Sequence, residues 1–317
     1  MGQRSVAEVE PSAADGPTPA GGALSVVLIT RNRADEASQA VARLVALPER
    51  PDVVVVDNGS RDGTPERVAR DCPSVRVIAE PENRGAAGRN VGARAASGRY
   101  VAFCDDDSWW TPGALARAAA IFDAHPSVAL IAAKVLLGEH RLPDPACEEM
   151  AASPLATPPQ LPGRRVLGFI ACGAVVRRDA FLSVGGFEPR SGVGGEERLL
   201  AVALAERGWD LLYVDDLVVH HHPSPVRDRA RRRAVQVRND LWFHWMRRPL
   251  RPALAEARRA LAAAAREPAA RAGLLDALRG GRWVLSARRP LPAGVEAELR
   301  LLDVSGPPAA PARGGRP

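Results

Sequence analysis

The sequence predicts an α/β protein: a doubly wound, mostly parallel sheet flanked by helices, with a helical region after it. Three observations support this prediction. Short apolar runs alternate with helical patterns through the first half of the chain, as they do where parallel strands are joined by crossover helices. One run ends in three consecutive aspartates, at a strand end of the kind where open α/β sheets bind ligands. After about residue 223 the composition becomes rich in Arg and Ala.

The first half supplies strand and helix signals in alternation. Apolar runs predict strands at residues 24–30, 53–57, 75–79 and 100–104. Helical patterns lie between these runs, at residues 35–47, 64–71 and 85–96. Thr64 is a helix-capping residue, and the Asn-Gly-Ser and Asp-Gly sequences before it are typical of turns. This order is that of repeated strand–helix–strand units.

The second half is less regular. Helices are predicted at residues 112–124, 196–207 and 253–265. Strands are predicted at residues 128–136, 166–176, 211–214 and 217–219. Residues 141–163 contain many prolines and predict a surface loop.

Four segments follow from these patterns. Residues 1–22 and 305–317 are rich in Pro, Gly and Ala and predict disordered tails. Residues 23–223 are predicted to form the α/β domain. Residues 224–304 are predicted to form a helical C-terminal region.

Bulk composition excludes several classes of protein. The 317 residues carry a formal net charge of +6, with Lys134 as the only lysine, and no nucleic-acid-binding signature accompanies this charge. The four cysteines form no CxxC pair, which indicates buried free thiols in a reducing compartment. The N-terminus has no signal-peptide pattern, and no stretch approaches the roughly 20 apolar residues of a membrane span. We therefore expect a cytoplasmic protein that does not bind nucleic acid.

The aspartate triplet, Asp105, Asp106 and Asp107, follows the strand at 100–104. Adjacent carboxylates repel each other, and burying them without a counter-charge forces protonation or costs several kcal/mol. A divalent cation resolves this conflict, because Mg²⁺ takes carboxylate oxygens and keeps positions open for phosphate oxygens. The triplet therefore predicts a metal–diphosphate site.

Further motifs flank the triplet in an order that resembles the family 2 glycosyltransferases with a GT-A fold. The resemblance covers about residues 24–222. The motifs are TRNR at 30–33, VVDNGS at 55–60, NRG at 83–85, GRNVG at 88–92, DDD at 105–107, GGF at 185–187, GEE at 195–197, GW at 208–209 and HHH at 220–222. Each motif is weak evidence alone, and their shared order and approximate spacing make the resemblance strong.

The resemblance implies a Rossmann-like GT-A sheet and an inverting enzyme. Such an enzyme moves a single hexosyl or deoxyhexosyl group from a nucleoside-diphosphate sugar, of the UDP or dTDP type, to an acceptor hydroxyl. It implies Mg²⁺ or Mn²⁺ as the cofactor and a role in making cell-surface glycans or glycoconjugates. Whether the acceptor is lipid-linked, a protein or a small molecule stays open.

The resemblance also assigns residues to the nucleotide. These are Thr30, Arg31, Arg33, Asp57, Asn83, Arg84, Asp105 and Asp106. Asp57 would accept a hydrogen bond from a base N–H or a ribose hydroxyl. Its alternative role is a turn-forming carboxylate bonded to Gly59 or Ser60, and the two roles can coexist.

The triplet resembles the DxD motif of the family. By that resemblance Asp107 binds the metal ion, while Asp105 contacts the ribose and assists the metal. Asp106 fills the variable middle position. Counting from Trp209 selects His221, from the run at 220–222, as the histidine near the metal and diphosphate.

Glu196 and Glu197 begin a predicted helix, where the helix dipole favours carboxylates. The family has Glu-Asp here, and its second acid is the base that deprotonates the acceptor hydroxyl. The resemblance therefore assigns this role to Glu197, with Glu196 as the second candidate. Two departures weaken the assignment: Glu stands for the usual Asp, and Leu199 replaces a following acid of the family.

Residues 227–248 combine many arginines with Trp242, Phe243 and Trp245. One interpretation is a peripheral contact with anionic lipid at the inner face of the membrane. The other is an amphipathic helix packed on the catalytic domain, with its arginines in water and its tryptophans inward. We favour the packed helix.

Two rival functions stay open. A nucleotidyltransferase also uses acidic metal sites, although a Gly-rich, Lys-bearing triphosphate loop is missing from the sequence. A degenerate relative would bind a nucleotide sugar or a membrane surface without turnover, and Leu199 and the Glu-for-Asp change at 197 are the features in its favour.

Overall fold

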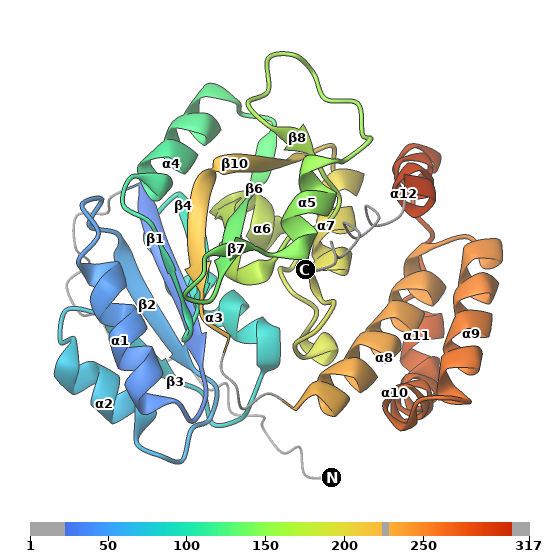
Figure 1. Ribbon diagram of the computed structural model, residues 1–317, viewed down its shortest axis with the longest axis horizontal. Coiled ribbons are helices and arrows are strands. Elements are labelled where there is room, and N and C mark those ends of the chain that lie inside the picture. Colours follow the sequence, from blue (N-terminus) through green and yellow to red (C-terminus); the bar gives the residue numbers. More distant parts are fainter. Residues whose placement is uncertain (1–22, 224–227, 306–317) are drawn as a thin grey trace, which may run out of the picture.

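The computed structural model describes residues 23–223 and 228–305. The tails predicted at 1–22 and 305–317 lie outside the described residues, apart from Ser305, which ends the last helix. The stretch 224–227, at the predicted domain boundary, also lies outside them. Figure 1 shows a twisted sheet flanked by helices, with a group of helices beside it. The α/β class and the helical C-terminal region are confirmed.

The first four strands form a parallel unit. They are β1 (Leu24–Thr30), β2 (Asp52–Asp57), β3 (Arg76–Ala79) and β4 (Tyr100–Asp105). β1 lies between β2 and β4, and β3 pairs with β2 at the edge of the sheet. Every residue of β1 is buried, because helices cover both faces of this unit.

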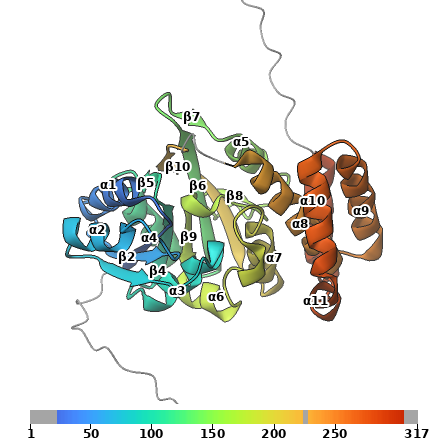
Figure 2. The ribbon, with the colours of Figure 1, turned by 90° about the horizontal axis from the view of Figure 1, so that it is seen from below.

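These helices are α1 (Ala34–Val45), α2 (Thr64–Asp71) and α3 (Gly88–Ala95), the last preceded by the 3₁₀ turn η1 (Gly85–Ala87). Figure 2 shows α1 and α2 on one face of the sheet and α3 on the other. The arrangement brings the carboxyl ends of β1, β2 and β4 to one edge. Thr30, Asp57 and Asp105 end these three strands, so the predicted motifs meet where open α/β sheets place their ligands.

The rest of the sheet is mixed. Its main strands are β5 (Ser108–Trp110), β6 (Val128–Leu137), β9 (Ala174–Arg177) and β10 (Asp210–His221). β6 and β10 pair in parallel, whereas β9 lies antiparallel between β4 and β6, and β5 lies antiparallel along the end of β10. The strands predicted at 211–214 and 217–219 are one strand, β10, with an irregularity between Val214 and Val218.

The strand predicted at 166–176 is wrong over most of its length. Only the stretch from Ala174 is a strand, and η2 (Ala171–Gly173) is a 3₁₀ turn. The apolar side chains of Val166, Leu167 and Phe169 are buried in the core but lie outside the strands of the sheet. Their apolar character reflects packing rather than strand pairing, and sequence periodicity does not separate these two causes.

The segment 141–163 is not a plain surface loop. It contains the short strand β7 (Leu142–Pro143) and the helix α5 (Pro145–Ala151). Asp144 caps this helix, because its side chain accepts a hydrogen bond of 2.9 Å from the amide of Ala146. Pro145 stands at the first helical position, where its missing N–H costs nothing. This proline therefore marks a helix start rather than an irregular loop.

Smaller elements complete the domain. They are α4 (Ala114–Ala124), α6 (Arg178–Ser183), α7 (Glu197–Glu206), β8 (Arg164–Arg165) and the 3₁₀ turn η3 (Pro189–Ser191). All four cysteines lie in the described residues, are buried and form no disulfide, as predicted.

The C-terminal region consists of helices packed on one another. They are α8 (Arg229–Arg247), α9 (Leu250–Ala264), α10 (Pro268–Arg279), α11 (Gly281–Ser286) and α12 (Ala293–Ser305). Trp242 of α8 is buried against Trp283, with the ring centroids 5.0 Å apart. Phe243 is also buried. The aromatic side chains of 227–248 thus point into the protein, which matches the packed helix rather than an aromatic contact with lipid.

In the part of the chain that the structure describes, no helix combines the length and apolar character that crossing a bilayer requires.

Candidate functional site

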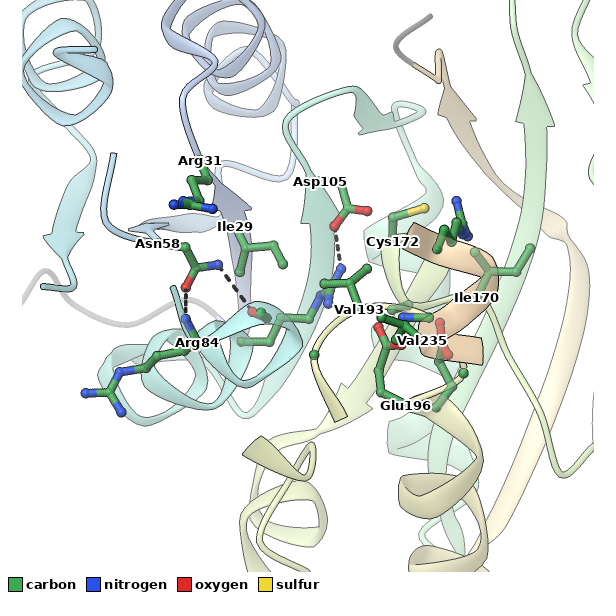
Figure 3. Close-up of a pocket in the computed structure, with 18 of the residues that line it drawn as sticks. Ile29, Arg31, Asn58, Arg84, Asp105, Ile170, Cys172, Val193, Glu196 and Val235 are labelled. Carbon is green, nitrogen blue, oxygen red and sulfur yellow. Dashed lines mark hydrogen bonds and ion pairs between the residues drawn. The ribbon is translucent and has the colours of Figure 1, made fainter. Parts of the chain in front are cut away.

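A pocket of about 880 Å³ lies at the carboxyl ends of β1, β2 and β4. Figure 3 shows two facing walls. One wall contains the ends of these strands and residues 83–85. The other contains the loop 192–195, the start of α7 and the N-terminal half of α8. We call them the nucleotide wall and the acceptor wall, after the ligands predicted from the sequence.

Seven of the eight residues predicted to contact the nucleotide line the pocket: Thr30, Arg31, Arg33, Asn83, Arg84, Asp105 and Asp106. Asn58 organises the nucleotide wall and was not among the predicted site residues. Its side-chain amide donates to the carbonyl of Gly85 at 3.2 Å, and its carbonyl oxygen accepts from the amide of Arg84 at 3.3 Å. The segment 83–85 is thereby tied to the end of β2.

Asp57 is buried behind this wall rather than exposed on it. Its carboxylate accepts hydrogen bonds from the amide of Ser60, at 2.8 Å, and from the hydroxyl of Ser60. This matches the turn-forming alternative, in which Asp57 shapes the loop that carries Asn58. A direct contact between Asp57 and a nucleotide stays a prediction.

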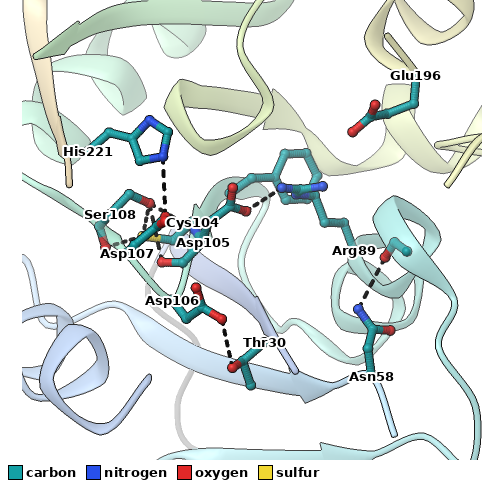
Figure 4. A network of polar contacts seen from close by, with 12 residues as sticks. Thr30, Asn58, Arg89, Cys104, Asp105, Asp106, Asp107, Ser108, Glu196 and His221 are labelled. Atoms are coloured by element: carbon teal, nitrogen blue, oxygen red, sulfur yellow. Dashed lines mark hydrogen bonds and ion pairs between the residues drawn. The ribbon is translucent and has the colours of Figure 1, made fainter. Parts of the chain in front are cut away.

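The three aspartates point to three different partners, as Figure 4 shows. Asp105 forms an ion pair with Arg89. Asp106 accepts from the hydroxyl of Thr30 and from Arg33, both at 2.9 Å. The repulsion inferred from the sequence is therefore relieved partly by arginines: Arg89 faces Asp105, whereas Asp106 and Asp107 share Arg33.

Asp107 faces both Arg33 and His221. Its carboxylate oxygens lie 3.4 Å from Nη1 of Arg33 and 3.3 Å from Nε2 of His221. The pairing of His221 with Ser108, between β10 and β5, brings the two side chains together. A hydrogen bond of 2.8 Å from the amide of His222 to the carbonyl of Asp107 supports the same contact.

The carboxyl of Asp106 differs from an ordinary surface acid. Burial raises the pKa of Asp106 to about 6, with Arg33 opposing the rise and the neighbouring Asp107 adding to it. The sequence placed Asp106 in the variable middle of the motif. The structure instead turns it toward Thr30 and Arg33, on the nucleotide wall.

The donor atoms of Asp107 and His221 fit a small divalent ion. Adjacent ligands of an octahedral Mg²⁺ at about 2.1 Å lie about 3.0 Å apart, close to the observed 3.3 Å. Within residues 23–223 and 228–305, no group of three or more His, Cys, Asp or Glu side chains is arranged to hold a metal. A Mg²⁺ or Mn²⁺ ion bound here would therefore depend on phosphate oxygens and water for its other ligands, as Mg²⁺ commonly does.

Glu196 and Glu197 lie at the start of α7 on the acceptor wall. Glu196 is buried, and its carboxylate accepts a hydrogen bond from the amide of Gly194. Glu197 is partly accessible. Burial and the adjacent Glu196 raise the pKa of Glu197 above the ordinary glutamate value.

Arg89 lies between the triplet and these two acids and was not among the predicted site residues. It is almost fully buried and pairs with Asp105, and its charge favours the ionised forms of Glu196 and Glu197. Its Nε and Nη1 atoms are buried without a hydrogen-bond partner among the described residues. Arg89 is part of the GRNVG motif at 88–92, and this motif was the feature of the sequence that could have identified it as a site residue.

The structure gives a reason for one departure from the family pattern, Leu199 in place of an acid. Its side chain is partly buried between α7 and the C-terminal helices, against the clusters that contain Trp242 and Phe243. An acid at this position would face an apolar contact. Leu199 therefore serves the packing of the C-terminal region.

The chain is similar to several known proteins. The model of the family described as glycosyl transferase family 2 matches residues 25–185, just over half of the chain. The N-acetylglucosaminyl-diphospho-decaprenol L-rhamnosyltransferase of Mycobacterium tuberculosis is 28% identical over 269 residues, which are 72% of this chain and 88% of that enzyme. The pre-mycofactocin glycosyltransferase of the same organism is 32% identical over 219 residues, which are 67% of this chain and 45% of that protein.

Among solved structures, the mannosyltransferase PcManGT from Pyrobaculum calidifontis, in complex with GDP-Man and Mn²⁺, is similar to this chain. The TM-score is 0.54 and the identity 21%, with 89% of this chain and 86% of that chain covered. At this identity the likeness shows the fold alone, and it confirms the predicted GT-A type.

Proposed function

Because the chain belongs to glycosyl transferase family 2, we propose that it moves a single sugar from a nucleoside-diphosphate sugar to an acceptor hydroxyl, with inversion at the anomeric carbon. One observation carries this proposal. The aspartate triplet and the pair Glu196 and Glu197 line opposite walls of one pocket. A donor held by one wall and an acceptor held by the other would meet between them.

On the nucleotide wall, Thr30, Arg31, Arg33, Asn83 and Arg84 would surround the nucleoside of a UDP- or dTDP-sugar. Asp106 would contact the ribose, because its carboxylate already accepts bonds from this wall. Asp105 would influence the bound nucleotide through its ion-pair partner Arg89 as well as by direct contact. Asp57 would support the wall from behind.

Asp107 and His221 would hold Mg²⁺ or Mn²⁺, with Asp105 close enough in sequence to assist. A bound divalent ion neutralises negative charge that develops on a departing diphosphate. The relative of known structure holds Mn²⁺ together with a sugar nucleotide. The carboxylate of Asp107 suits Mg²⁺ or Mn²⁺, whereas an imidazole ligand such as His221 is more typical of transition metals, which favours Mn²⁺.

Glu197 would be the general base. Its carboxylate takes the proton of the acceptor hydroxyl while that oxygen bonds to the anomeric carbon, and the bond from this carbon to the diphosphate oxygen breaks. Glu197 is the more accessible acid of the pair, whereas Glu196 is held by the amide of Gly194. Arg89 opposes the rise in the pKa of both carboxyls and so favours the ionised form that a base requires.

The acceptor would be lipid-linked. The name of the mycobacterial rhamnosyltransferase describes an acceptor in which a sugar is joined by a diphosphate to decaprenol. We propose an acceptor of this class and a role in cell-surface glycan synthesis. Because that relative is an L-rhamnosyltransferase and rhamnose is a deoxyhexose, we also propose a deoxyhexosyl donor. We place the enzyme in the cytoplasm at the inner face of the membrane. Residues 228–305 carry seventeen arginines against eight acidic residues, which favours an anionic surface.

A panel of nucleotide sugars tests the proposal, first by thermal shift with and without Mn²⁺ and then by release of nucleoside diphosphate. A donor at 100 times its dissociation constant should stabilise the protein by about 2.7 kcal/mol. Release of pyrophosphate from a nucleoside triphosphate would instead indicate a nucleotidyltransferase. Stabilisation by a sugar nucleotide without turnover, with every acceptor class tried, would indicate a protein that only binds it.

A further inference from the structure

The acceptor wall contains a row of arginines on α8. Arg231, Arg232 and Arg238 all line the pocket, together with Val235 between them. Positions 231, 235 and 238 follow the spacing of one helix face. This face of α8 therefore presents positive charge along the acceptor side of the site.

These arginines differ from Arg33 and Arg89 in how their charge is balanced. Arg231 and Arg232 are exposed and have no ion-pair partner in the part of the chain that the structure describes. Arg238 is half-buried and donates to the carbonyl of Ser191 and the side-chain oxygen of Asn239, both of which are neutral. Burial lowers the pKa of Arg238, and the only acid that opposes this is Asp276.

Two acids also line the pocket near this row, and each has a structural role. Asp228 caps α8 by accepting from the amide of Arg231 at 2.8 Å. Asp144 caps α5 by accepting from the amide of Ala146. By contrast, Arg33 on the nucleotide wall pairs with Asp106 and Asp107. The charge on α8 thus remains available to a ligand.

The row is close to the base. Asn239 of α8 is buried and donates to the carbonyls of Ser191 and Gly194, at 2.9 and 2.8 Å. These residues belong to the segment that leads directly into Glu196 and Glu197. An acceptor whose hydroxyl reaches Glu197 would therefore extend along α8, whose Val235 lies next to Gly194.

We propose that Arg231, Arg232 and Arg238 form a binding site for a phosphate or diphosphate group carried by the acceptor. This inference rests on the proposed function and names the part of the acceptor that the enzyme recognises. Guanidinium groups suit this task because they bind phosphate oxygens in a bidentate manner and remain charged. The diphosphate of the donor would lie near Asp107 and His221, so the row on α8 is a second anion site.

The test compares two acceptors that carry the same sugar. One is a short-chain alkyl diphosphate-linked N-acetylglucosamine, and the other is the neutral octyl glycoside. In the double variant Arg231→Gln/Arg232→Gln, KM for the diphosphate acceptor should rise about ten-fold or more, as expected for lost charge-assisted bonds. KM for the neutral acceptor and for the donor should not change. Arg238→Gln is measured separately, because Arg238 also holds Ser191.

The matched control is Arg251→Gln/Arg258→Gln, which removes two exposed arginines of α9 that do not line the pocket. It should leave all kinetic constants unchanged. A rise in the donor KM of the α8 double variant would overturn the proposal, since the arginines would then hold the donor diphosphate. Equal changes with both acceptors would overturn it too.

Binding is measured independently of turnover, by calorimetric titration of both acceptors into the enzyme with nucleoside diphosphate present. We expect the diphosphate acceptor to bind at least ten-fold more tightly than the neutral one to the wild type, and this preference to disappear in the α8 double variant. Absence of the preference in the wild type would refute the site. Because titration needs no transfer, failure of the site and failure of the proposed reaction give different results.

Discussion

The two walls of the pocket are built in different ways. On the nucleotide wall, strand ends and short loops hold the charged groups, and Arg33 and Arg89 are paired with the aspartates they face. On the acceptor wall, a helix from the C-terminal region supplies arginines that lack acidic partners among the described residues. Arg33 and Arg89 on the first wall have their charges balanced within the protein, whereas the arginines of α8 on the second retain charge for a ligand.

Net charge shows the same contrast at a larger scale. Residues 23–223 contain 26 acidic and 22 basic residues, whereas residues 228–305 contain 8 acidic and 17 basic ones. The acidic part contains the proposed metal and base residues. The basic part borders the proposed acceptor path. The difference suggests that donor chemistry and acceptor recognition can be disrupted separately by substitutions on the two walls.

The largest effect is expected on the nucleotide wall. Asp107→Ala should reduce transfer by about 10³-fold or more, because it removes a metal ligand and the charge stabilisation that depends on it. Release of nucleoside diphosphate at saturating Mn²⁺ measures this. Asp35→Ala, at an exposed position of α1, is the control and should be fully active. Near-normal Mn²⁺-dependent turnover of Asp107→Ala would refute the assignment.

On the acceptor wall, Glu197→Gln should lower kcat by about 10²–10⁴-fold, since a glutamine cannot take a proton. Donor binding, measured by thermal shift, should be retained. Glu196→Gln should lower kcat less, because Glu196 is engaged with Gly194. If Glu196→Gln proves to be the more damaging substitution, Glu196 is the base.

The charge of Arg89 couples the two walls, and pH dependence measures that coupling. Glu197 must be deprotonated to act, and its pKa is raised by burial, so kcat/KM should increase with pH through an inflection above the ordinary glutamate value of about 4.3. Arg89→Met removes a positive charge that favours the ionised carboxylates, so the inflection should move to higher pH. An inflection that stays in place would show that Arg89 does not influence the base.

A smaller effect is expected where α8 supports the loop before the base. Asn239→Ala removes the side-chain donor to the carbonyl of Gly194 and leaves that of Ser191 with Arg238 alone, which should lower the free energy of unfolding by about 1–3 kcal/mol. kcat should fall while the donor KM is retained. Urea denaturation and steady-state kinetics measure the two quantities, with Arg229→Ala at the exposed start of α8 as the control. A change in donor KM alone would contradict the separation of the walls.

Much of the nucleotide wall could be predicted from the sequence. The alternation of strand and helix signals gave the order of β1 to β4, and the polar residues that follow these strands proved to share one edge of the sheet. The acceptor wall was harder to predict. The strand at 166–176 was misplaced because buried apolar residues there are packed without pairing, and α5 was missed because its first proline resembles a loop signal.

The residues on α8 show most clearly what could not be predicted from the sequence. Arg231, Arg232 and Arg238 lie in a segment whose arginines all look alike in the sequence, and Trp242 and Phe243 suggested a lipid contact as readily as a core. Burial of these two aromatic side chains fixes which face of α8 points inward. Only then does it follow which arginines reach the pocket.

By itself, the sequence determined the fold class, the family and the identity of the acids at the strand and helix ends, because these depend on local periodicity and on motifs in order. The tertiary structure alone decided the partners: Arg33 with Asp106, Arg89 with Asp105, and Asn239 with the loop before Glu196. These contacts join residues far apart in the chain. Any arginine could pair with any aspartate on charge alone, so the choice among them is made by how the helices and strands pack.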